Sequence, residues 1–387
     1  MYVQMWKASL IYIVRKSKVK ELFKMNMTEV KKADEKVFYY MIADHTEEAK
    51  KMSEKKSAVD GHAGNWGMDI HNWDWNPGVG LTAMSYYYRK TKNKEVLEYL
   101  QKWLEINRYK CDIIKAVNAT APYTIYPLMY EETRDVYYLE KSIEHCYWLI
   151  NYAPRAENGA FQHTVNTESI NEKLRNQVWA DTIFMSVLFM ATVARVSGNT
   201  AFASEVMKQL ELHIDVLQDP ETGVLYHGYN CTTKGHMSGA LWARGNAWLT
   251  IGIPLIISEI QNLVVVPEEF LQKYRKLVKG LAGFQGENGL WHTVLNHPEY
   301  YQETSGSAGI AAGIAKAVKL GLVDVSYQSC AKAGLQGVLG KIGYRGEVNG
   351  VSGGTPIMKT IAEYNELTCY TTLYGQGLTL LLLCEFI

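Results

Sequence analysis

The feature that most constrains the fold is a sixfold alternation of two kinds of predicted helix. Six segments are apolar on every side and rich in small residues. They begin near Gly78, Ala121, Ala180, Gly245, Gly306 and Gly375. More charged, amphipathic segments alternate with them, over residues 28–43, 94–109, 136–150, 201–217, 267–281 and 324–339. Helices that are apolar all round are buried and amphipathic helices cover a core, so the pattern predicts six inner and six outer helices.

The connections between these segments favour an all-α fold, a closed (α/α)6 barrel. The turns from an inner helix to the next outer helix are short, for example at residues 90–93 and 132–135, as antiparallel neighbours require. The return connections are long and aromatic, so all of them emerge at one end of the barrel. At that end each inner helix presents its N-terminus, where free N–H groups and the helix dipole favour an anion.

Composition narrows the partners and the compartment. Lys plus Arg and Asp plus Glu number 40 each, which gives no electrostatic case for nucleic acid or an anionic membrane as partner. The six cysteines are scattered, so we expect free thiols in a reducing compartment, with the cytoplasm as the default. We interpret residues 28–387 as one catalytic barrel and residues 1–27 as an N-terminal extension that the barrel can dispense with. The oligomeric state stays open.

Aromatic and polar residues gather in the loops that precede the inner helices. In the first, Trp73 and Trp75 stand among polar residues, and Trp75 is a candidate for stacking on a ligand. In the second, Asn118 is most simply a helix N-cap. In the third, Asp181 follows Trp179 and precedes Phe184. Apolar surroundings raise the pKa of a carboxyl group and suit it to general-acid catalysis, although Asp181 could equally be a helix cap.

Three more residues in these loops are candidates for substrate binding. Arg244 and Trp248 are four residues apart and share one helix face. A guanidinium beside an indole fits a ring that bears a carboxylate; a salt bridge over a core tryptophan is the alternative. His163 and His227 each end a loop of the same form, which indicates a shared mouth. No metal-binding or cofactor-binding motif occurs, so we expect neither a metal nor a cofactor.

Taken in order, these loops resemble glycoside hydrolase family 105, the unsaturated rhamnogalacturonyl hydrolases. The resemblance rests on motifs at residues 73–81, 121–133, 179–185, 222–227, 242–248 and 303–308, and it runs to the C-terminus. The unsaturated glucuronyl hydrolases of family 88 share the barrel and much of the pattern. The resemblance implies an (α/α)6 barrel that removes a 4,5-unsaturated uronic acid from the non-reducing end of oligosaccharides made by a polysaccharide lyase.

The resemblance also implies a mechanism. A proton is added to carbon 4 of the unsaturated ring, water adds to carbon 5, and the resulting hemiketal opens and releases the aglycone. Asp181 matches the single acid/base of the family. His163, His227, Arg244 and Trp248 match positions that line the substrate pocket, and Trp75 falls where an aromatic ring stacks. Asn118 departs from the pattern, because several relatives have an aspartate there, and this puts a two-carboxylate scheme in doubt.

Three alternatives remain open at this point. The removed sugar could derive from glucuronate, as in ulvan, rather than from galacturonate. A sugar epimerase resembling N-acylglucosamine 2-epimerase, on the same barrel, would use His163 and His227 for proton transfer. A toroid that binds oligosaccharides without catalysis would need neither histidine nor Asp181 as an acid.

Overall fold

The computed structural model describes residues 27–47, 67–166 and 168–387, so residues 1–26 of the expected extension lie outside the described part. The inner helices are α4 (Trp75–Thr91), α6 (Ile125–Thr133), α9 (Leu188–Ser197), α11 (Ala243–Ile260), α13 (Thr304–Lys319) and α15 (Leu373–Cys384). The outer helices are α2 (Met27–Ile42), α5 (Lys94–Asn107), α7 (Val136–Asn151), α10 (Thr200–Leu217), α12 (Glu268–Gly283) and α14 (Gln328–Leu339).

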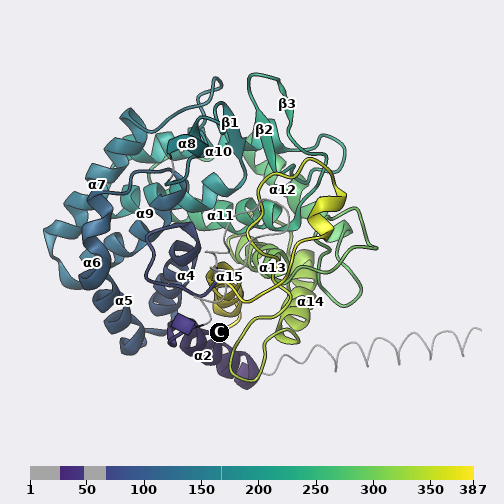
Figure 1. Cartoon of the computed structure of the whole chain (residues 1–387), viewed down its shortest axis with the longest axis horizontal. Coiled ribbons are helices and arrows are strands. Elements are labelled where there is room, and N and C mark those ends of the chain that lie inside the picture. The colour runs from purple at the N-terminus through teal and green to yellow at the C-terminus, as the bar shows by residue number, and fades with distance from the viewer. Residues whose placement is uncertain (1–26, 48–66, 167) are drawn as a thin grey trace, which may run out of the picture.

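The inner helices form a closed ring, with the outer helices around it (Figure 1). Each inner helix contacts the next along the chain, and α15 returns to pack against α4. Inner helices such as α11 are buried on nearly every side. Outer helices bury one face, as α12 does with Phe270, Tyr274 and Leu277. The prediction of an all-α (α/α)6 barrel is therefore confirmed, and its cause is the predicted difference between the two helix types.

Glycines let α11 and α13 pack closely. A Cβ atom on Gly306 would lie 2.9 Å from the backbone nitrogen of Arg244. A Cβ atom on Gly313 would lie 2.2 Å from the carbonyl oxygen of Thr250. Since such distances are shorter than van der Waals contact, the small residues of α13 are required for this approach, and they hold the N-terminus of α11 in place.

Two inner helices begin irregularly. The second starts with the 3-10 helix η2 (Asn118–Thr124), because Pro122 has no N–H for a regular α-helical bond. The third starts with the π-helical turn η3 (Ile183–Val187), two residues after Asp181. π-helical turns are rare and occur often at functional sites. The remaining short helices are η1 (Arg108–Asp112), α8 (Glu168–Asn171), η4 (Val325–Tyr327) and η5 (Ala362–Asn365).

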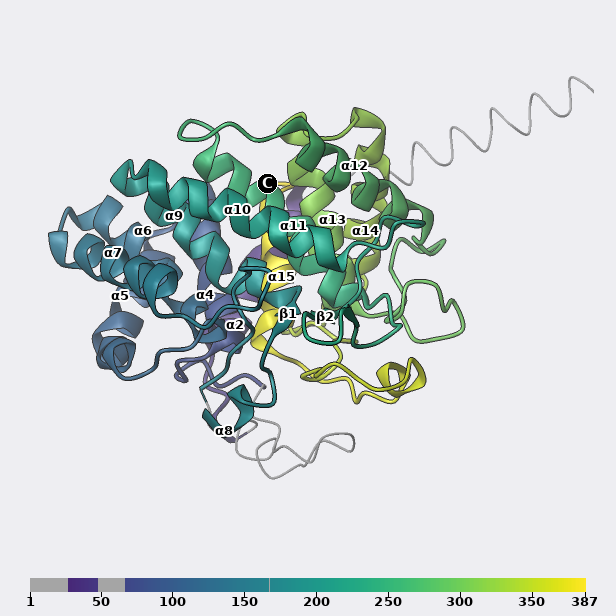
Figure 2. The ribbon, with the colours of Figure 1, turned by 90° about the horizontal axis from the view of Figure 1, so that it is seen from above.

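A small antiparallel sheet, which the sequence did not predict, joins two of the long connections. It consists of β1 (Gln177–Trp179), β2 (Gly228–Asn230) and β3 (Gly235–His236), in that order. Strands this short carry too few residues for an alternating pattern to be recognised. The sheet lies with the long connections at one end of the barrel (Figure 2).

The short turns begin with capping side chains. Asn93, Asp135 and Asn199 are the N-caps of α5, α7 and α10, and each accepts a hydrogen bond from a backbone N–H of its own helix. The predicted antiparallel neighbours are thus joined at the end opposite the long connections. Of the helices in the described part of the chain, none combines the length and the apolar character that a membrane span requires.

Candidate active site

Strand pairing brings Asp181 and His227 together. Trp179 of β1 lies opposite Gly228 of β2, and the backbone N–H of Ala180 donates to the carbonyl oxygen of His227 at 3.2 Å. The residues that follow β1 and precede β2 are therefore neighbours. As a result, Asp181 Oδ2 lies 3.7 Å from His227 Nε2. The sequence placed both residues at the mouth but gave no signal for this contact, because no strand was expected.

The environment of Asp181 favours its protonated form. Its side chain is only 14% exposed. Burial raises its pKa to about 6, while the charge of Arg244 and the nearby indole N–H of Trp248 act in the opposite direction. That N–H is not placed for a full hydrogen bond, and Oδ2 has no hydrogen-bond partner among the described residues. The carboxyl group can therefore hold a proton close to neutral pH.

The two candidate histidines are buried and neutral. His163 stacks on Trp179, with ring centroids 4.1 Å apart and planes 6° apart, and burial lowers its pKa to about 3. His227 meets the edge of the same indole and packs against Trp242. Burial also holds the pKa of His227 well below its ordinary value. Trp179 thus links the two histidines, as their matching loops predicted.

Arg244 is held from all sides at the start of α11. Its guanidinium lies between the rings of Trp242 and Tyr374, 4.5 and 4.6 Å from their centroids. The two terminal nitrogens donate hydrogen bonds to oxygen atoms of the 352–355 segment at 2.5 to 3.1 Å. Glu303 Oε1 is 3.6 Å from the guanidinium. Arg244 thus ties the connection before α15 to the ring of inner helices.

Glu303 is the buried counter-charge of Arg244. It is the N-cap of α13 and accepts hydrogen bonds from the backbone N–H groups of Ser305 and Gly306. It also accepts one from the N–H of Ser352 at 3.0 Å. Its capping role agrees with the interpretation of residues 302–307 as a cap. Its pairing with Arg244 carried no sequence signal, because the two residues belong to different helices.

Trp75 and Asn118 also lie at the mouth. The indole of Trp75 stacks on Tyr374 at 5.0 Å, and Tyr374 is the residue that flanks Arg244. Asn118 is linked to the histidine loop, because its backbone N–H donates to the carbonyl oxygen of Thr164. The interpretation of Asn118 as an N-cap is wrong: η2 is preceded by Val117, and Asn118 lies inside the helix.

Trp248 belongs more to the core than to the surface of the mouth. It is fully buried, and its ring packs against Phe184, with centroids 5.1 Å apart. Its indole nitrogen points to the neighbourhood of Asp181, whose pKa it lowers. The structure therefore places Trp248 beneath the acid rather than beside an open ring.

Most of the predicted site residues share one unusual property. Each carries a buried polar atom that has no hydrogen-bond partner among the described residues. These atoms are Asn118 Oδ1, His163 Nδ1, Asp181 Oδ2, His227 Nε2 and Trp248 Nε1. Buried polar groups in folded proteins almost always have a partner. A group of unpaired donors and acceptors at the barrel mouth is therefore a site for a polar ligand.

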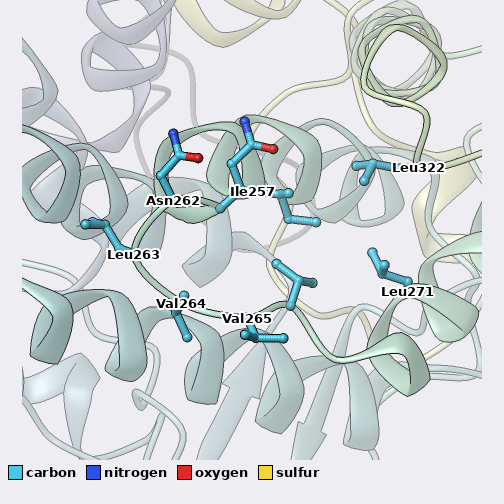
Figure 3. A pocket seen from close by; sticks show the side chains of 9 residues that line it. Ile257, Asn262, Leu263, Val264, Val265, Leu271 and Leu322 are labelled. Atoms are coloured by element: carbon cyan, nitrogen blue, oxygen red, sulfur yellow. The ribbon is translucent and has the colours of Figure 1, made fainter.

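A separate groove of about 580 Å³ lies at the opposite end of α11 (Figure 3). It is lined by aliphatic side chains, among them Ile257, Val264, Val265 and Leu271, and by the amides Gln261 and Asn262. Ile257 is roughly 20 Å along the helix from Arg244. Because the groove has no titratable side chain, it does not serve acid/base chemistry. Within residues 27–47, 67–166 and 168–387, no three His, Cys, Asp or Glu side chains are grouped to hold a metal ion.

The fold and the site define a class of protein: a toroid of helical hairpins with a protonatable carboxyl group and aromatic rings at its mouth. The sequence profile of glycosyl hydrolase family 88 matches residues 46–387. The chain belongs to this family and is a glycoside hydrolase, which confirms the resemblance found in the entry loops.

Individual relatives agree with this assignment. The chain is 31% identical to unsaturated rhamnogalacturonyl hydrolase YesR of Bacillus subtilis over 319 residues, which cover 81% of this chain and 89% of that protein. It is 26% identical to an unsaturated 3S-rhamnoglycuronyl hydrolase of Alteromonas sp., over 54% of this chain and 51% of that protein. A crystal structure of a possible family 105 member from Salmonella enterica superposes with a TM-score of 0.84 at 30% identity, over 94% of both chains.

Proposed function

We propose that this glycoside hydrolase removes a 4,5-unsaturated uronic acid from the non-reducing end of oligosaccharides produced by a polysaccharide lyase, with rhamnogalacturonan fragments as the first choice. The name of YesR, which this chain matches over most of its length, supports this choice. The observation that carries the proposal is the group of unpaired buried polar atoms around Asp181, because a sugar ring with hydroxyl groups can pair with them.

In this proposal Asp181 performs both proton transfers. Its protonated carboxyl group gives its proton to carbon 4 of the enol ether, and positive charge develops at carbon 5 and the ring oxygen. The resulting carboxylate then takes a proton from the water that adds to carbon 5. The hemiketal product opens and releases the aglycone, so that one carboxyl group is sufficient. The raised pKa of Asp181, about 6, supports the first step.

We assign the remaining predicted residues to substrate binding. Asn118, His163 and His227 have unpaired polar atoms that suit sugar hydroxyl groups. Trp75 offers an aromatic face for stacking, and the positive ends of the inner helices favour the carboxylate. Arg244 adds a positive charge, but a direct contact with the substrate carboxylate requires it to share bonds now made to the 352–355 segment. Trp248 acts from beneath, on Asp181.

We also propose a cytoplasmic location, which the free state of all six cysteines supports. The substrate would then be a short oligosaccharide that has been taken up.

The decisive experiment follows the double bond. Unsaturated disaccharides from rhamnogalacturonan, ulvan and glycosaminoglycan digests are incubated with the enzyme while the absorbance of the enol ether is recorded. We expect the absorbance to fall, fastest with the rhamnogalacturonan product, and the reaction in heavy water to leave one deuterium at carbon 4. A saturated disaccharide should remain intact. Unchanged absorbance with all three substrates, or a product without deuterium at carbon 4, would contradict the proposal.

A further inference from the structure

We propose that Tyr364 is a positioning residue that holds His227 in the tautomer with its hydrogen on Nε2, and so directs an N–H group at Asp181. The effect on rate rests on the function proposed above, whereas the tautomer does not. Tyr364 lies in η5, in the connection before α15, far along the chain from either residue. No motif in the sequence marked it.

The hydrogen bonds at the Tyr364 hydroxyl decide the tautomer. Its oxygen lies 2.9 Å from His227 Nδ1 and 3.2 Å from the backbone nitrogen of Met358. An amide N–H can only donate, so the tyrosine oxygen accepts from Met358 and its hydrogen is available for the histidine. Nδ1 must then accept. In a neutral imidazole the other nitrogen, Nε2, carries the hydrogen.

The nitrogen with the hydrogen faces the acid. Nε2 of His227 and Oδ2 of Asp181 are 3.7 Å apart, and neither has a hydrogen-bond partner within the described chain. A small movement brings them into hydrogen-bond contact. The N–H would then stabilise the Asp181 carboxylate after its proton has left. Besides Asp181, the charged or titratable side chains that act on His227 are Arg244 and His163, and together with burial they keep its ring neutral.

This arrangement also defines what His227 does not do. Its one available lone pair, on Nδ1, is bound by Tyr364 and points away from Asp181. A base that removes a proton from a sugar carbon needs a free lone pair at the site. His227 is therefore a hydrogen-bond donor and not a general base. This distinguishes the site from the epimerase alternative, in which the histidines would transfer protons.

Tyr364 is fixed firmly enough for this task. It is fully buried and packs in a cluster with Trp242, Met358 and Leu367. Its carbonyl oxygen accepts a hydrogen bond from the Tyr301 hydroxyl at 3.2 Å. A partner that orients a functional histidine must itself be held by packing and hydrogen bonds. Tyr364 meets this requirement.

Nitrogen-15 spectra of histidine-labelled protein test the tautomer directly. In the wild type we expect His227 Nδ1 to give the signal of an unprotonated nitrogen and Nε2 that of an N–H. In Tyr364→Phe, which loses only the hydroxyl, we expect a mixture of tautomers. Its kcat should fall by about 10- to 100-fold, the range found when the partner that orients a metal-bound histidine is removed. KM should change little, because the altered contact acts after substrate binding.

Tyr301→Phe is the matched control. It removes a tyrosine hydroxyl from the same cluster but none that touches His227, so its spectrum and kcat should stay close to the wild type. A hydrogen on Nδ1 in the wild type overturns the proposal, even if Tyr364→Phe cannot be folded. So does a normal kcat in a folded Tyr364→Phe. If no substrate is hydrolysed at all, the proposed function fails, and the wild-type spectrum still decides the tautomer.

Discussion

The two ends of the barrel hold buried polar clusters of opposite character. At the closed end, Arg89 of α4, Glu131 of α6, Arg195 of α9 and Glu259 of α11 alternate in charge around four successive inner helices. Glu131 lies 2.6 Å from both arginines, Glu259 is 3.6 Å from Arg89, and it is also hydrogen-bonded to Arg195. Each charge at this end therefore has two partners of opposite sign.

At the mouth the polar atoms of Asp181, His163, His227 and Asn118 are unpaired instead. The pKa values reflect this difference. Burial raises the pKa of Asp181 to about 6. Burial also acts on Glu131, but the hydrogen bond from Arg195 and the charge of Arg89 lower its pKa overall. Satisfied charges hold helices together, whereas unsatisfied ones are available to a substrate, so the two ends should respond differently to substitution.

The largest effect is expected at the mouth, for Asp181→Asn. The amide keeps the size of the side chain but has no proton to transfer, so kcat should fall by about 10⁴-fold or more, the upper end for loss of one acid/base group. Stability should not suffer. The folded pKa is raised, so ionisation of Asp181 costs stability as the pH rises from about 4 through 6. At pH 7 the variant should unfold at the same denaturant concentration as the wild type or at a higher one.

A matched control is Asp34→Asn. Asp34 is also buried, on the outer helix α2, with a pKa raised to about 6 mainly by burial. It accepts a hydrogen bond from Tyr87 and is not part of the mouth. Its replacement should leave kcat within about twofold of the wild type, since surface-side changes far from the chemistry rarely alter rates strongly. Near-normal turnover by Asp181→Asn would end the assignment of Asp181 as the acid.

At the closed end the opposite result is expected for Glu259→Gln. The change leaves Arg89 and Arg195 with one carboxylate between them. Breaking a buried ion pair typically costs 3–5 kcal/mol, and because Arg195 is 35% exposed we expect about 3 kcal/mol of unfolding free energy to be lost. Folded Glu259→Gln should keep its kcat. Chemical denaturation and steady-state assays on the same sample measure both, and a large loss of kcat in the folded variant would contradict the separation of the two ends.

The pH dependence of kcat/KM sharpens the comparison further. The free enzyme must hold the proton on Asp181, whose pKa is about 6. The rate constant should therefore fall about tenfold per pH unit above that value, reaching roughly 100-fold at pH 8. Asp34 and Asp74 have pKa values of about 6 as well. The profile should be the same in Asp34→Asn and Asp74→Asn, and a profile that loses its descending limb in either would move the acid to that residue.

The sequence was sufficient for the barrel because helix burial is a local property: the small residues of α13 and the amphipathic α12 reveal their positions one helix at a time. It was also sufficient for Asp181, His163 and His227 as residues of one mouth, because each precedes an inner helix. In both cases periodicity along a single segment carries the information.

The contacts within the site depend on the fold as a whole. The approach of Asp181 to His227 needs the pairing of β1 with β2, whose strands are too short to predict. The partners of Arg244, namely Glu303 and the 352–355 segment, come from two other connections. Tyr364 reaches His227 from a third. Such pairs are set by ring closure, which no local pattern encodes, so the sequence identified candidates but not the network that orients them.

A smaller effect is expected for recognition of the substrate carboxylate by Arg244. Replacement by alanine would also strand Glu303, which is fully buried beside it, so the substrate should be changed as well as the protein. A carboxyl-reduced, neutral substrate should raise the KM of the wild type by about 10- to 100-fold, as loss of a charge-assisted hydrogen bond predicts. Equal KM values for the acidic and neutral substrates would assign Arg244 to holding the 352–355 segment and not the sugar.

The smallest effect is expected for Asn118→Ala. The amide oxygen of Asn118 is buried and unpaired, and it lies at the mouth without a proton to donate to carbon. Removing it should cost one neutral hydrogen bond to a sugar hydroxyl, about 1 kcal/mol or roughly fivefold in kcat/KM. Asn118→Asp restores the aspartate of several relatives and adds a second carboxyl group. If one acid is sufficient, this variant should gain no more than a few fold over the wild type. A rise of 100-fold or more would show that two carboxylates serve the reaction better and that Asn118 limits this enzyme.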